Sequence, residues 1–98
     1  MNEDLIVKIV SYSDVKKEFR KPNTISLEEL KTSILKRLGN IEVSNKHLRD
    51  KNEFKKRIKS AKSLSELKDK DLFYGTGWSI EIFDVAEYYR NKNKGWRA

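Results

Sequence analysis

Basic side chains are concentrated in one segment of this 98-residue chain, and they are its clearest candidates for contact with a partner. The segment from Lys46 to Lys62 holds eight basic residues against two acidic ones, a net charge of +6 out of +7 for the whole chain. The eight are Lys46, Arg49, Lys51, Lys55, Lys56, Arg57, Lys59 and Lys62. Charge concentrated in this way creates a field at the surface, so the segment predicts an anionic partner.

Other groups that could do chemistry do not form a recognisable catalytic or metal-binding motif. His47 is the only histidine, and no residue pattern marks a nucleophile or an orienting partner for it. Asp69 and Asp71 alternate with lysines, which makes a poor calcium loop. Gly75 and Gly77 lack the helix start and the lysine of a phosphate-binding loop. We therefore expect a protein that is not an enzyme and has no catalytic residue, metal or cofactor.

Two classes of partner fit the basic segment. In the first interpretation, a small binding, adaptor or inhibitor protein docks this face on an acidic protein surface, where charge complementarity speeds association. In the alternative, phosphates of DNA or RNA are neutralised by Lys55, Lys56, Lys59 and Arg49, which gives salt-dependent and weakly sequence-selective binding. An exposed face that only keeps the protein in solution is the third interpretation. Candidate auxiliary contacts are Lys8, Arg20 and Trp96.

Composition predicts one small domain. The charged fraction of 38% exceeds the roughly 25% of an average chain, yet the aliphatic residues cluster in regular patterns that can form a core. There is no cysteine, and no apolar run is long enough for a membrane span, so we expect a cytoplasmic protein with no membrane partner. We place the domain at residues 1–90 and a mobile basic tail at 91–98.

The strands that must support the basic segment lie near the two ends of the chain. Leu5 to Val10 is nearly continuous in apolar character, as in a central strand covered on much of both faces. Ser11 to Asp14 predicts a turn, and Val15 to Arg20 predicts the second strand of a hairpin. Alternating apolar residues from Trp78 to Phe83 predict a further strand. Residues 86–90 fit either a strand or a helix.

A helix over residues 27–38 has the strongest local signals. Ser26 and Glu29 have the spacing of a capping box, and an apolar stripe follows. Gly39 is placed to end the helix in the left-handed conformation.

The basic segment itself predicts a second helix, capped by Ser44 or Asn45 and running to about Lys62. Its apolar stripe is narrow and consists of His47, Phe54, Ile58 and Ala61. We therefore expect a thin packing seam that holds His47 at least half-buried. Residues 41–43 could form a very short strand before this helix. Ser63 with Glu66 predicts another cap, which opens a short helical turn.

The order of these elements resembles the ubiquitin-like β-grasp superfamily. The matching stretches are Leu5 to Gly39, and Ser63-Leu64-Ser65-Glu66-Leu67 followed by the strand at Ile80 to Phe83. Ile25-Ser26-Leu27-Glu28-Glu29-Leu30 is most similar to the scaffold domains of the Phox/Bem type. The chain departs from ubiquitin in the helical residues 41–62 and in the absence of a terminal Gly-Gly, so conjugation is not implied.

The resemblance implies an α+β fold in which the N-terminal hairpin and the C-terminal strand form a small β-grasp-like sheet on the capped helix. The basic helix is then an insertion. The resemblance also implies that the last strand pairs in parallel with the first, and that Lys8 faces an acidic partner.

Overall fold

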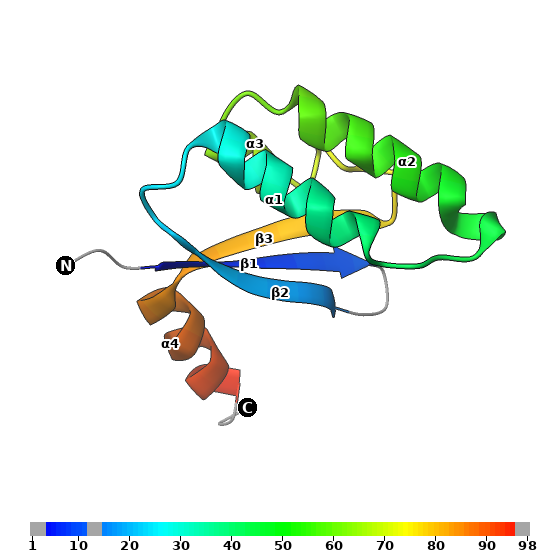
Figure 1. Cartoon of the computed structure of the whole chain (residues 1–98). Helices are drawn as coiled ribbons and strands as arrows, with labels where there is room; N and C mark the ends of the chain where they lie inside the picture. The colour runs from blue at the N-terminus through cyan, green and yellow to red at the C-terminus, as the bar shows by residue number, and fades with distance from the viewer. Residues whose placement is uncertain (1–3, 12–14, 96–98) are drawn as a thin grey trace.

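The computed structural model describes residues 4–11 and 15–95, with side chains described for residues 4–11 and 17–90. The element order is β1 (Asp4–Ser11), β2 (Val15–Pro22), α1 (Leu27–Gly39), α2 (Asn45–Ser60), α3 (Leu64–Leu67), β3 (Trp78–Asp84) and α4 (Val85–Gly95). The strands form one sheet in the order β2-β1-β3. Helices α1 and α2 cover one face of this sheet, and α4 lies on the other side (Figure 1). The predicted α+β class is confirmed.

β1 is the central strand, as its apolar run predicts. Val7 and Ile9 point towards α1 and α2 and have no exposed surface. Ile6 points to the opposite face and is also buried, because α4 packs against β1 and β3 there. The predicted hairpin is present, since β1 and β2 pair antiparallel.

β3 runs antiparallel to β1, so the parallel pairing implied by the ubiquitin-like resemblance is wrong. The register places Trp78 beside Ser11 and Asp84 beside Leu5. The cause is where the chain enters the sheet: the connection after α3 delivers β3 to the end at which β1 finishes. A tight turn makes this entry, with Gly75 at φ 87° and Gly77 at φ 79°, both in a region that glycine tolerates best.

α1 begins as its sequence predicts and ends differently. The Ser26 hydroxyl accepts a hydrogen bond from the Glu29 N–H at 3.2 Å. Gly39, however, stays helical, and Asn40 at φ −87° is the C-cap. The expected left-handed glycine is not needed, because the Asn40 N–H reaches the Arg37 carbonyl from a right-handed conformation.

Residues 41–43 form no strand, which corrects one expectation. Their backbone lies beside helices: the Ile41 N–H donates to the carbonyl of Leu38, and the Ile41 carbonyl accepts from the Lys51 ammonium. The Ile41 side chain is in the core instead. Ser44 is the N-cap residue of α2, and the helix ends at Ser60.

The ambiguous residues 86–90 belong to helix α4. Asp84 starts this helix, since its Oδ1 accepts a hydrogen bond from the Glu87 N–H at 2.6 Å. The helical backbone of α4 continues through Gly95, so the first five residues of the expected tail, 91–95, are helical. The remainder of the expected tail, residues 96–98, lies outside the described residues.

Candidate binding surface on helix α2

Helix α2 is attached to the body by a narrow apolar seam, as predicted. Phe54 and Ile58 have no exposed surface, and Ala61 follows just after the helix. The Phe54 ring meets the ring of Phe73 edge-on at 4.9 Å and stacks on Trp78 at 5.6 Å between centroids. Burial of a large apolar side chain contributes about 1.5–3 kcal/mol, so a few residues suffice to hold the helix.

His47 does not join this seam, and the expectation that it packs is wrong. Its position on the helix is aligned with Phe54, yet its side chain is exposed. The reason is the length of α2, whose first turns extend past the end of the sheet and of α1 (Figure 1). The sheet and α1 therefore do not cover this end of α2, and His47 stays exposed.

Lys51 occupies the seam position that His47 was expected to fill. Only 8% of Lys51 is exposed, and its ammonium donates a hydrogen bond to the Ile41 carbonyl. Burial lowers the pKa of Lys51 from 10.5, the positive charge of Lys55 lowers it further, and Glu42 acts in the opposite direction. Lys51 is one of the eight predicted contact residues, but the structure places it inside the fold.

Arg57 is a second member of the basic segment whose side chain is engaged within the protein. Its Nη1 donates to the carbonyls of Leu72 at 2.9 Å and Tyr74 at 2.6 Å, and its Nε pairs with Glu53 at 3.2 Å. These bonds fasten the loop before β3 to α2. Because an arginine held by two carbonyls and a carboxylate has few donors left, we treat Arg57 as a structural residue.

The other six basic residues remain available at the surface. Lys46, Arg49, Lys56, Lys59 and Lys62 are exposed, and Lys55 is half-buried. Opposite the seam, four residues at helical spacing form a line that we call the outer ridge. The outer ridge consists of Asn45, Arg49, Asn52 and Lys56. At 100° per residue, Lys55 and Lys59 lie on one side of it and Lys46 on the other.

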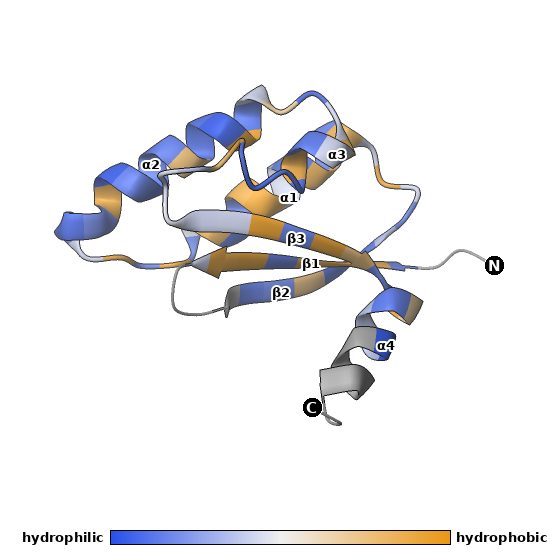
Figure 2. Cartoon of the chain, turned by 180° about the vertical axis from the view of Figure 1, so that it is seen from behind, coloured by the Kyte–Doolittle hydropathy of each residue, from blue (hydrophilic) through white to orange (hydrophobic). Residues whose placement is uncertain are grey.

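The outer ridge lines an open surface depression together with Leu48 and Glu53. Figure 2 shows α2 as predominantly hydrophilic along its length, with a few hydrophobic residues. Sequence reasoning missed Asn45, Leu48 and Asn52 as surface partners of the basic residues. Their spacing was the available signal, since residues i, i+4, i+7 and i+11 share one face of a helix.

Acidic residues do little to cancel the charge of the outer ridge. α2 contains two, Asp50 and Glu53, and neither lies on the ridge. Asp50 is half-buried, and Glu53 pairs with Arg57. The first turn of α2 contains no acidic residue. The ridge therefore presents positive charge and amide groups without an interleaved carboxylate.

Lys8 lies on the far face of the sheet, away from α2. Its ammonium is 6.0 Å from the ring centroid of Phe83 and 5.6 Å from that of Tyr88. Lys8 is half-buried, and its register partners on the neighbouring strands are Glu18 and Glu81. This lysine is therefore already surrounded by aromatic rings and carboxylates of its own chain.

The two remaining auxiliary candidates do not extend the α2 surface. Arg20 is exposed on the far face of the sheet, with its Nε 3.7 Å from the carboxylate of Asp4. Trp96 lies outside the described residues.

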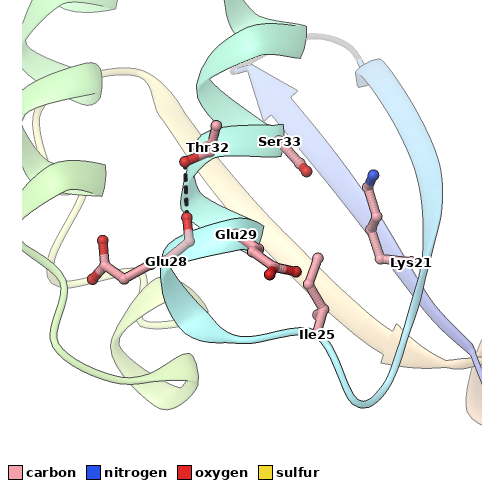
Figure 3. A pocket seen from close by; sticks show the side chains of 6 residues that line it. All are labelled: Lys21, Ile25, Glu28, Glu29, Thr32 and Ser33. Carbon is pink, nitrogen blue, oxygen red and sulfur yellow. Dashed lines mark hydrogen bonds between the residues drawn. The ribbon is translucent and has the colours of Figure 1, made fainter.

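A second depression lies between α1 and β2 (Figure 3). It is lined by Lys21, Ile25, Glu28, Glu29, Thr32 and Ser33. Two carboxylates accompany the single cation, and the Thr32 hydroxyl is committed to the Glu28 carbonyl at 2.9 Å. The mixed charge gives this depression no preference for an anion. An adjoining depression is lined by Lys21, Lys36 and Arg37 without a carboxylate, but these three cations come from two elements, β2 and α1, whereas the basic residues of α2 lie along one helix.

Within the described ranges 4–11 and 15–95, no group of three or more His, Cys, Asp or Glu side chains is arranged to hold a metal ion. In the same part of the chain, no helix combines the length and the apolar character needed to cross a membrane. Comparisons with protein-family models, with curated proteins and with solved structures find no match to this chain.

Proposed function

We propose that this protein is a non-enzymatic nucleic-acid-binding protein that contacts phosphates through the outer ridge of α2 and its flanking lysines. The observation that carries the proposal is the excess of positive charge on that surface, where the one carboxylate lining the depression, that of Glu53, pairs with Arg57. Five available basic residues of α2 lie on or beside the ridge, Lys62 follows just after the helix, and neither acidic residue of α2 lies on the ridge. Neutralisation of phosphates by such side chains releases counterions and drives association.

The composition of the surface favours nucleic acid over an acidic protein. Five of the six available basic residues are lysines, and Arg49 is the only arginine among them. The cores of protein–protein interfaces are depleted in lysine and enriched in arginine and aromatic residues. Lysine, by contrast, serves well as a point charge for phosphate.

An acidic protein surface remains the second candidate, because one apolar side chain lies within the patch. Leu48 is 44% exposed and lines the same depression as Arg49. A leucine beside an arginine could anchor a protein partner. Both candidate functions are compatible with the cytoplasmic location that the sequence predicts.

Salt dependence tests the proposal directly. Fluorescence anisotropy with a labelled random-sequence DNA duplex should show binding that weakens steeply between about 50 and 200 mM salt. With four or five phosphates neutralised, log K should fall against log salt with a slope of about −4. Absence of binding at 50 mM salt to duplex DNA, single-stranded DNA and duplex RNA alike would reject the nucleic-acid function. A pull-down from the native cell, comparing wild type with Leu48→Glu, would then test the protein partner.

A further inference from the structure

We infer that the nucleic acid is double-stranded DNA in the B form, and that the N-terminal half of α2 enters its major groove. This inference rests on the proposed function and names its substrate class. It is carried by three features of α2: its projection beyond the body, the amide groups on its outer ridge, and the position of its lysines.

The projection gives the helix access to a groove. Every residue from Ser44 to Arg49 is exposed, including His47 on the side that is aligned with the seam. The first turn of α2 is therefore exposed on every side, whereas the second turn is covered at Lys51 and exposed on its outer side. A major groove about 12 Å wide admits a helix of this kind, provided that no other part of the protein blocks it. Figure 1 shows this end of α2 beyond the rest of the fold.

The outer ridge carries the groups that read base edges. An asparagine amide can bond to adenine through two hydrogen bonds, and an arginine can do the same with guanine. Asn45, Arg49 and Asn52 lie along one line of the helix, and the rise from the first to the last is about 10.5 Å. With base pairs stacked about 3.4 Å apart, this length matches about three base pairs.

The lysines lie where phosphates would be. Lys56 continues the outer ridge, while Lys55 and Lys59 flank it in the C-terminal half of the helix. If the N-terminal half occupies the groove, these side chains meet the backbone at its rim. Base contacts and phosphate contacts would therefore come from different halves of one helix.

Other nucleic acids fit the surface less well. Single strands are bound by stacking of bases on aromatic rings beside a basic groove. Trp78 is only 7% exposed and stacks on Phe54, so its ring is not available. Tyr74 is 82% exposed but sits on the Arg57 and Glu53 side of α2, off the outer ridge. Double-stranded RNA has a major groove too deep and narrow for a helix.

Three labelled ligands of equal length and matched sequence distinguish these substrates: duplex DNA, single-stranded DNA and duplex RNA. At 100 mM salt, the duplex DNA should bind at least about tenfold more tightly than either of the others. Equal binding of all three would leave the proposed function intact and overturn the duplex inference. Tighter binding of the single strand that is lost in Tyr74→Ala would also overturn it. No binding of any of the three would overturn both.

Two exposed-residue variants test the division of roles along α2. Selection from a random duplex library should give a sequence preference for wild type that Asn52→Ala relaxes, with the salt slope unchanged. Lys56→Ala should weaken binding to all sequences about equally and reduce the salt slope by about 1. If Asn52→Ala leaves the preference unchanged, or if wild type selects no sequence at all, the ridge does not read base edges.

Discussion

The ammonium of Lys51 donates a hydrogen bond to the backbone carbonyl of Ile41, at the junction where the chain leaves α1 and enters α2. Because residues 41–43 form no strand, the Ile41 carbonyl has no partner in a sheet. The ammonium of Lys51, in the middle of the basic segment, bonds this carbonyl instead. Because this lysine faces inwards, its role is structural, although the sequence groups it with the contact residues. Lysines of α2 that face inwards should affect stability, and those that face outwards should affect binding, so the two kinds can be separated by experiment.

Replacing Lys51 should change stability without changing binding. Lys51→Ala leaves the Ile41 carbonyl without its partner, so we expect the free energy of unfolding in urea to fall by about 1–3 kcal/mol. DNA affinity of the folded protein should stay within about twofold, because the ammonium does not reach the surface. Lys56→Ala is the matched control, with stability preserved within about 0.5 kcal/mol and affinity reduced. The reverse pattern would contradict the assignment.

Lys51 should also give the protein a specific alkaline pH response. Burial lowers the folded-state pKa of Lys51 below the ordinary value of 10.5 that applies to the unfolded chain. At a pH between these two pKa values, the unfolded chain therefore binds more protons at this site than the folded protein does. The free energy of unfolding contributed by Lys51 therefore rises with pH across that window. The difference between wild type and Lys51→Met, measured in urea from pH 7 upward, isolates this contribution. A difference that stays constant up to pH 10.5 would show that the lysine is not buried as described.

Arg57 should stabilise the loop before β3. Arg57→Lys keeps the charge but cannot bond the carbonyls of Leu72 and Tyr74 together with Glu53 in the same fork geometry. We expect the free energy of unfolding to fall by about 1–2 kcal/mol, and amide exchange in residues 72–76 to become faster. An unchanged exchange rate in this loop would show that the arginine does not hold it.

Phe54 should be the residue on which attachment of α2 depends most. Phe54→Ala removes the ring that meets Phe73 and Trp78, and it should cost about 3–5 kcal/mol. Leu48→Ala provides the control on the same helix, since Leu48 is 44% exposed and should cost less than about 1 kcal/mol. Urea denaturation measures both. Similar costs for the two variants would mean that the seam has been assigned to the wrong side of α2.

Local sequence signals predicted most of the fold because they act over a few residues. Ser26 and Glu29 marked the start of α1 correctly, and the alternation around Ile80 identified β3. The direction of β3 was not predictable in the same way, because it depends on where the chain enters the sheet after α3. Helical periodicity likewise placed Phe54 in the seam, but it could not show that His47 lies beyond the body.

The sequence allowed the basic helix to be predicted, but it did not show which of the basic side chains are available at the surface. The sequence places all eight basic residues in one segment, whereas the fold directs Lys51 inwards and engages Arg57 in the loop. Which cations remain available depends on backbone carbonyls contributed by residues 41, 72 and 74, and no local pattern connects these to α2. The same applies to Lys8, which is half-buried by α4 from the other end of the chain.

The central claim, that the outer side of α2 binds nucleic acid, is tested most directly by charge reversal at matched positions. The first variant combines Lys56→Glu with Lys59→Glu on α2, and the control combines Arg20→Glu with Arg90→Glu, exposed residues of β2 and α4. Both variants change the net charge by the same amount. With duplex DNA at 100 mM salt, the α2 variant should lose at least about a hundredfold in affinity, and the control less than about fivefold. Equal losses in the two variants would show that only net charge matters, and would contradict a binding surface on α2.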